Sequence, residues 1–189
     1  MSVRLPYLPV SVDGHTVAWD LWDGSPACRT DMRWENEGWT AQIDLIPDRA
    51  TVVLRLSARW TLQQMLLFRD MDAPDLWLVT DGHGGWGEMN GARVDELEGC
   101  TDIDVAGTPF TNSIIIRRLP LEDGFSGAIP VAVFDVETLA VERWNVVYTR
   151  HDRHTWEYDS LRAGRRSFAG IDDHGLVIDE EGVFRRVDA

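Results

Sequence analysis

Apolar and polar residues alternate in short stretches along almost the whole chain. In residues 51–58 the apolar side chains stand at every even position, and this period of two is typical of a strand with one buried face. Similar stretches predict further strands at residues 39–46, 65–69, 76–80, 129–136, 143–150, 155–158, 176–178 and 183–187. The pattern therefore predicts a mainly β protein.

Turn-forming pairs such as Asn90-Gly91 and Asp123-Gly124 separate these stretches. Short strands at close, regular spacing indicate antiparallel meanders. We expect a single β-rich domain over residues 1–189, built as a curled antiparallel sheet or open barrel with at most one or two short helices. One helical turn is predicted at residues 108–113, with Thr108 as the N-cap and Pro109 at the first helical position.

The chain is strongly acidic, with 18 basic against 32 acidic residues and a net charge of -14. Such a charge opposes binding to nucleic acid or to an anionic membrane surface. No apolar run approaches the roughly 20 residues of a membrane helix, and the N-terminus lacks a signal-peptide pattern. We therefore expect a cytoplasmic protein without nucleic-acid partners or integral membrane association, in which Cys28 and Cys100 are free thiols.

Signals for a metal, a cofactor or a catalytic nucleophile are weak. The glycine-rich residues 82–87 lack the Lys-Ser/Thr of a phosphate loop and predict a turn, and residues 151–154 predict a hairpin loop despite two histidines. Asp102 and Asp104 would share one face of a strand, but no other carboxylate or histidine stands at a familiar ligand spacing. We expect no metal and no cofactor. Acid–base chemistry and pairing with arginines remain open as roles for the two carboxylates.

Nine tryptophans in 189 residues is a high number. Tryptophan combines a large apolar ring with one N–H donor, so it suits both core corners and the walls of sites for partly polar ligands. We expect about six of the nine to be core residues. Trp86 and Trp144 are the candidates for a ligand site.

Residues 99–119 contain the most specific motif of the chain. Their order is Gly99-Cys100-x-Asp102-Ile103-Asp104, then Thr108-Pro109-x-Thr111-Asn112-Ser113, then Ile116-Arg117-Arg118-Leu119. Downstream follow Tyr148-Thr149-Arg150, Tyr158, and a closing segment that ends in Phe184-Arg185-Arg186-Val187. Over about residues 32–187 the chain resembles the bacterial Putative glycolipid-binding family. The closing segment of such proteins commonly has a tyrosine where this chain has Asp179 or Glu180.

The resemblance implies a curved antiparallel sheet, similar to bacterial lipoprotein-carrier folds, that encloses an apolar cavity. An isoleucine-rich strand at residues 114–116 would line or close that cavity. Polar and aromatic side chains near its mouth would meet the ligand's headgroup; the candidates are Asp102, Asp104, Thr111, Asn112, Arg117, Arg118, Tyr148, Arg150, Trp86 and Trp144.

The function that we expect is non-catalytic binding of an amphiphilic molecule, such as a glycolipid or a fatty-acyl conjugate. One alternative is an enzyme that acts on a similar small amphiphile with Asp102 or Asp104 as acid or base. Another is a structural or interaction protein without a ligand. A cavity with convergent polar groups favours the first two, and a carboxylate with a raised pKa facing that cavity favours the enzyme.

Arg117 and Arg118 are adjacent, so in a strand they would point to opposite faces. Both faces of residues 114–118 are apolar, and at least one of the two arginines should therefore be buried. A buried guanidinium needs acceptors, and Asp102 and Asp104 are the nearest suitable carboxylates. We predict at least one ion pair between these aspartates and these arginines.

Overall fold

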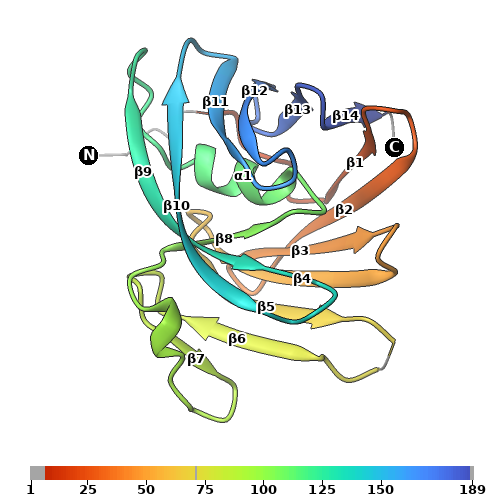
Figure 1. Ribbon diagram of the computed structural model, residues 1–189, viewed down its shortest axis with the longest axis vertical. Coiled ribbons are helices and arrows are strands. Elements are labelled where there is room, and N and C mark those ends of the chain that lie inside the picture. Colours follow the sequence, from red (N-terminus) through yellow and green to blue (C-terminus); the bar gives the residue numbers. More distant parts are fainter. Residues whose placement is uncertain (1–6, 71, 188–189) are drawn as a thin grey trace.

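The computed structural model describes residues 7–70 and 72–187, and these form one curled, open sheet of fourteen strands (Figure 1). The first seven strands are β1 (His15–Leu21), β2 (Pro26–Glu35), β3 (Gly38–Leu45), β4 (Ala50–Ser57), β5 (Leu62–Phe68), β6 (Leu76–Thr80) and β7 (Trp86–Glu88). After a short 3-10 helix, η1 (Asp95–Leu97), come β8 (Asp102–Val105) and the helix α1 (Phe110–Ile116). The remaining strands are β9 (Ser126–Phe134), β10 (Val141–Arg150), β11 (Thr155–Ser160), β12 (Arg165–Ile171), β13 (Val177–Glu180) and β14 (Phe184–Val187).

The sheet consists of two antiparallel meanders joined side by side. Its strand order is β7-β6-β5-β4-β3-β2-β1-β14-β13-β12-β11-β10-β9-β8, so the pairing of β1 with β14 connects the two meanders. Only the edge strand β8 pairs in parallel with its neighbour, β9. The prediction of a mainly β, curled antiparallel sheet is confirmed.

Each strand predicted from the alternation is present, and β6 has the predicted bounds. The structure adds β1, β2, β7, β8 and β12, which the alternation did not reveal. β2 begins at Pro26, a residue that interrupts a strand pattern in the sequence but is tolerated at the first position of a strand. β7 has three residues, which is too few to show a period.

The predicted isoleucine-rich strand is wrong, because residues 110–116 form the helix α1. The helix begins at Phe110, two residues after the predicted N-cap, although the Thr108 hydroxyl still accepts the Phe110 N–H at 3.2 Å. All seven residues of α1 are buried. The rest of the protein encloses the helix on every side, so the tertiary environment overrides the strand preference of isoleucine here.

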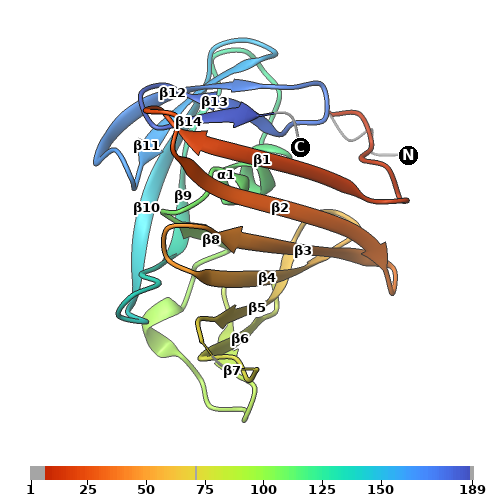
Figure 2. The same ribbon diagram turned by 90° about the vertical axis from the view of Figure 1, so that its right-hand side faces the viewer.

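Helix α1 lies inside the curl of the sheet (Figure 2) and contacts both halves of the core. Phe110 and Ile114, one helical turn apart, belong to the cluster that β1–β7 mainly build. Ile115 and Ile116 belong to the second cluster, which comes mainly from β9–β13. Residues 101–118 therefore cross the interior and fill the space between the two meanders. Among the described residues, no helix has the length and apolar character required to cross a membrane.

Candidate functional site

A groove of about 320 Å³ lies where four segments meet: the β9–β10 hairpin, the residues after β8, the β3–β4 turn and the β11–β12 turn. We call it the groove; it is lined by Asp48, Ala106, Gly107, Val133, Phe134, Asp135, Val136, Glu137, Trp144, Leu161 and Arg162. A Cβ atom on Gly107 would lie 3.0 Å from a methyl carbon of Leu45, so a larger residue would separate the segment after β8 from the β3–β4 turn.

Trp144, a predicted site residue, forms the exposed wall of the groove. It is 47% exposed, a high fraction for so large an apolar side chain. Its Nε1 donates a hydrogen bond of 3.1 Å to the Glu142 carboxylate, which fixes the edge of the ring. Trp144 and Val133 also line an adjoining hollow of about 310 Å³, together with Asp135, Thr138, Ala140 and Glu142.

A narrow crevice of about 10 Å³ adjoins the groove and shares Ala106, Leu161 and Arg162 with it. We call it the crevice; it is lined by Asp104, Val105, Ala106, Thr108, Asn112, Ser160, Leu161, Arg162, Glu180 and Phe184. Its volume corresponds to about one water molecule. The predicted enclosed apolar cavity is therefore replaced by a surface groove and a small, polar crevice beside it.

Asp104 of β8 is the predicted residue that lies deepest in the crevice wall, with 2% of its surface exposed. Its Oδ1 accepts a 2.8 Å hydrogen bond from the Thr111 hydroxyl of α1, whereas its Oδ2 has no partner among the described residues. Burial raises the pKa of the Asp104 carboxyl to about 7, and the nearby Glu180 adds to this rise. Asp104 is thus a carboxyl that gains or loses a proton near neutral pH.

Glu180, at the end of β13, faces the same crevice and is 1% exposed. Its Oε2 accepts a 2.8 Å hydrogen bond from the Tyr158 hydroxyl, and its Oε1 has no partner among the described residues. Burial raises the pKa of Glu180 as well, although the Ser160 hydroxyl lies close enough to oppose the rise without forming a hydrogen bond to Oε1. Two buried carboxyl groups with one free oxygen each therefore face one small space.

Two tyrosines support this polar wall from behind. Tyr148 and Tyr158 are fully buried, with ring centroids 5.4 Å apart. The Tyr148 hydroxyl donates a 2.6 Å hydrogen bond to Oδ1 of Asn112, which orients that amide beside the crevice. Of the predicted site residues, Asp104, Thr111, Asn112 and Tyr148 are thus brought together, and Trp144 lies on the adjoining groove.

The predicted ion pair exists between Asp102 and Arg118. Arg118 is only partly buried, however, and the buried arginine is Arg117, at 3% exposure. Arg117 does not pair with either aspartate, contrary to the predicted arrangement. In a helix, successive side chains diverge by about 100° rather than by the half turn of a strand, so the two arginines reach different surroundings.

The Arg117 guanidinium packs over an aromatic ring instead of a carboxylate. Its Cζ lies 4.0 Å from the centroid of Trp60 and 6.0 Å from that of Tyr7. Its Nε and Nη1 have no hydrogen-bond partner among the described residues, and burial lowers the pKa of Arg117 to about 10. Cation–π contact with Trp60 therefore takes the place of the predicted ion pair.

Trp86 and Arg150, like Asp102, Arg117 and Arg118, are predicted ligand residues that line neither the groove nor the crevice. Trp86 is buried in β7, and its Nε1 donates to the backbone carbonyl of Cys100 at 2.7 Å. Arg150 is buried at the end of β10 and donates to Asp123 at 2.7 Å. These contacts attach neighbouring loops to the sheet.

The groove and the crevice also contain residues that the sequence did not indicate, chiefly Glu180, Leu161 and Arg162. Strict alternation would bury Ile178 together with Glu180, but Ile178 is exposed and Val177 is buried instead. A register shift between Gly170 and Ile171 in the β12–β13 pairing accompanies this change. The resemblance to the family shows a departure at Asp179 or Glu180, where a tyrosine is common, but it did not indicate Glu180 as a site residue.

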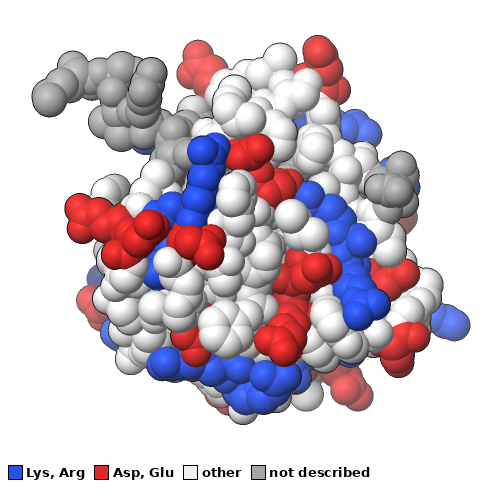
Figure 3. Space-filling model, turned by 90° about the horizontal axis from the view of Figure 1, so that it is seen from above, with Lys and Arg blue, Asp and Glu red and all other residues white. Residues whose placement is uncertain are grey.

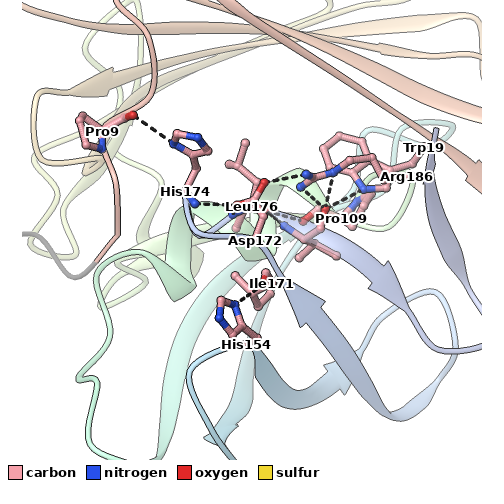
Figure 4. A network of polar contacts seen from close by, with 11 residues as sticks. Pro9, Trp19, Pro109, His154, Ile171, Asp172, His174, Leu176 and Arg186 are labelled. Carbon is pink, nitrogen blue, oxygen red and sulfur yellow. Dashed lines mark hydrogen bonds and ion pairs between the residues drawn. The ribbon is translucent and has the colours of Figure 1, made fainter. Parts of the chain in front are cut away.

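A polar network joins α1 to the junction of the two meanders (Figure 4). Arg186 donates to Asp172 at 2.6 Å and, from two nitrogens, to the Val177 carbonyl, which also accepts from Trp19 Nε1 at 3.0 Å. The Val177 N–H donates to the Ser113 hydroxyl of α1 at 2.9 Å. This network holds β13, and thus Glu180, in a fixed position relative to the helix.

Charges of both signs cover the face seen from above, where arginines form short runs between acidic patches (Figure 3). Within the part of the chain that the structure describes, no three histidine, cysteine or acidic side chains form a group suited to a metal ion. Cys28 and Cys100 are free and buried, as predicted.

Comparisons with known proteins support the family resemblance that the motif in residues 99–119 indicated. The family model described as Putative glycolipid-binding matches residues 17–186. A crystal structure of a DUF1089 family protein from Pseudomonas aeruginosa superimposes with a TM-score of 0.73 at 29% sequence identity, covering 89% of this chain and 96% of that chain. No curated protein matches the chain. With nine-tenths of its length matched by one family model and its fold shared with a solved structure, the chain belongs to the Putative glycolipid-binding family.

Proposed function

We propose that the protein binds an amphiphilic molecule, such as a glycolipid or a fatty-acyl conjugate, without changing it chemically. The apolar part of the ligand lies in the groove against Val133, Trp144 and Leu161, and its headgroup points toward the crevice. The observation that carries the proposal is the junction itself: a groove of about 320 Å³, in which apolar side chains stand beside charged ones, shares three lining residues with a crevice of buried polar groups. Small-molecule sites typically combine an apolar wall with a few convergent polar groups.

The expected affinity is moderate. Each buried methylene of a ligand contributes about 0.8 kcal/mol, so four or five of them in the groove contribute about 3–4 kcal/mol. That amount alone corresponds to a dissociation constant in the millimolar range. The polar contacts of the headgroup must therefore supply the rest, together with its selectivity.

Titration with octyl glucoside and with octanoyl glycine, below their critical micelle concentrations, tests the proposal. We expect saturable binding of at least one of them in isothermal titration calorimetry, with a change in tryptophan fluorescence. Trp144→Ala should weaken binding about tenfold, because it removes the largest apolar surface of the groove. Trp34→Ala is the matched control, since Trp34 is 37% exposed in β2 and does not line the groove or the crevice.

Binding of neither probe to the wild-type protein would contradict the proposal and favour an interaction protein without a ligand. Equal weakening by Trp144→Ala and Trp34→Ala would move the site away from the groove. Native mass spectrometry of protein purified from its own cells, followed by extraction of any bound molecule, would identify the natural ligand.

Acid–base catalysis on a similar amphiphile is a second candidate function, and Asp104 is the observation that favours it. Asp104 lines the crevice, one of its oxygens has no partner among the described residues, and its pKa is raised to about 7, close to that of an effective acid–base group. Asp102 is less suited, because Arg118 and the Thr101 hydroxyl occupy its two oxygens. Hydrolysis of 4-nitrophenyl octanoate with a rate change near pH 7, abolished in Asp104→Asn, would support this function over simple binding.

A further inference from the structure

Two buried carboxyl groups face the crevice in the same manner. In each, one oxygen is fixed by a hydroxyl donor at 2.8 Å, from Thr111 to Asp104 and from Tyr158 to Glu180. In each, the other oxygen has no partner among the described residues. A buried polar atom without a hydrogen bond is unfavourable by about 1–3 kcal/mol, so this pair of free acceptors requires a donor.

The size of the crevice limits what that donor is. A space of about 10 Å³ holds one water molecule or one hydroxyl group, and it excludes a whole sugar ring or a phosphate group. A second anionic group would also face two carboxyl groups at close range, which is unfavourable in a buried site. The donor must therefore be small and uncharged: a water molecule, or the hydroxyl group of a larger ligand whose other parts stay in the groove.

We infer that one hydroxyl of an uncharged ligand headgroup enters the crevice and donates a hydrogen bond to the free oxygen of Asp104 or Glu180. This inference rests on the proposed function and gives it a substrate class: amphiphiles with a neutral, hydroxyl-bearing headgroup. Asp104 and Glu180 are then the residues that determine specificity, whereas Val133, Trp144 and Leu161 bind the apolar part.

Selectivity follows from the same contacts. An ether or an ester in place of the hydroxyl supplies no donor, so its entry displaces water and leaves both carboxyl oxygens unsatisfied. Sites built to bind a hydroxyl reject analogues that lack it much more strongly than apolar sites reject a missing methylene. Anionic headgroups are rejected by charge, and the exposed Arg162 at the rim is screened by solvent.

The first experiment changes only the ligand. Octyl glucoside, its fully O-methylated analogue and octyl phosphate share one apolar chain and differ in headgroup donors and charge. In calorimetric titrations of the wild-type protein we expect the methylated analogue and the phosphate to bind at least about tenfold more weakly than octyl glucoside, as the loss of one buried hydrogen bond predicts.

The second experiment changes the protein. Asp104→Asn and Glu180→Gln keep side-chain size but replace a free acceptor by an amide whose N–H₂ can donate to an ether oxygen. In at least one of these variants, the ratio of the affinity for octyl glucoside to the affinity for its O-methylated analogue should fall toward one. Glu181→Gln is the matched control, because Glu181 is the exposed neighbour of Glu180, and it should keep the wild-type ratio.

The outcomes separate the two proposals. Binding of all three ligands with similar affinity, still weakened by Trp144→Ala, would overturn the hydroxyl inference and leave the groove as the ligand site. Binding of none would overturn both. The control variant gives a further test. If Glu181→Gln removes the preference for octyl glucoside as fully as Asp104→Asn and Glu180→Gln do, the inference is also overturned. If neither crevice variant folds, the ligand comparison on the wild-type protein decides alone.

Discussion

The two meanders of the sheet have different interiors. In β4 every second residue is buried, and the buried residues, Ala50, Val52, Leu54 and Leu56, are all apolar. The second meander also alternates, but β10 and β11 bury Tyr148, Arg150, Tyr158 and Ser160 beside apolar residues. Among the buried polar or charged side chains of the described residues, Thr30 alone belongs to β1–β7.

This difference suggests that the first meander contributes mainly to stability and the second mainly to binding. Apolar burial is favourable without directional contacts, so the first meander is suited to stabilise the fold. Buried polar groups are neutral or unfavourable unless each has a partner, so the second meander gains little stability from them. Ser160 lines the crevice, and the Tyr148 and Tyr158 hydroxyls donate to Asn112 and Glu180, which also line it.

The largest effect should come from the apolar meander. Leu54→Ala removes a fully buried side chain from β4 and should lower the free energy of unfolding by about 2–5 kcal/mol. Urea unfolding monitored by circular dichroism measures this change. Ile46→Ala, at a side chain that is 49% exposed, is the control and should change stability by less than about 1 kcal/mol. Similar effects for both variants would mean that the first meander is not the main apolar core.

Asp104 should make stability depend on pH in an unusual direction. Its folded pKa of about 7 exceeds the unfolded value near 3.9, so the folded state binds the additional proton between these values. The free energy of unfolding should therefore fall as pH rises from about 4 to about 7, by up to about 4 kcal/mol for this group. Asp104→Asn should remove that part of the decline, so the variant gains stability relative to wild type as pH rises.

Asp31 of the first meander provides the opposite case for the same measurement. Its hydrogen bond with Arg29 lowers the pKa of Asp31, so its contribution is present above about pH 4 and is lost as pH falls further. Urea unfolding of Asp104→Asn and Asp31→Asn at several pH values would distinguish the two pH dependences. If the free energy of unfolding of Asp104→Asn differs from that of wild type by a constant amount from pH 4 to pH 7.5, burial does not raise the pKa of Asp104 as assigned here.

Buried hydroxyl groups should respond differently in the two meanders. Tyr148→Phe removes the donor to Asn112 and should lower the free energy of unfolding by about 1–3 kcal/mol, because the amide oxygen loses its partner. The Thr30 hydroxyl is buried without a partner among the described residues, so Thr30→Val should leave stability unchanged or raise it. Destabilisation by Thr30→Val equal to that of Tyr148→Phe would contradict the comparison.

The smallest effects concern arginines over tryptophan rings. Arg117→Lys should cost about 1–2 kcal/mol, because the ammonium cannot reproduce the planar stacking on buried Trp60. Arg185 stacks at 3.9 Å over Trp22, which is 39% exposed, and Arg185→Lys should cost less than about 1 kcal/mol. Thermal unfolding of both variants measures the difference. A larger loss of stability for Arg185→Lys than for Arg117→Lys would mean that the buried contact with Trp60 is not the stronger of the two.

The sequence by itself determined nine of the fourteen strands and the turns between them, because a period of two and a glycine turn are local features. The alternation predicted β4, and β6 has the predicted bounds. The spacing of residues 99–119 likewise pointed to the Asp102–Arg118 pair, whose members lie near each other in the chain.

Only the tertiary structure decided the conformation of the isoleucine run and the composition of the crevice. Isoleucine favours a strand locally, and enclosure by two meanders makes residues 110–116 a helix, which in turn directs Arg117 to Trp60. Asp104 and Glu180 come from distant strands, and a register shift between Gly170 and Ile171 accompanies the inward turn of Glu180. A local pattern records the period of each strand, whereas the meeting of two side chains depends on how all the strands curl together.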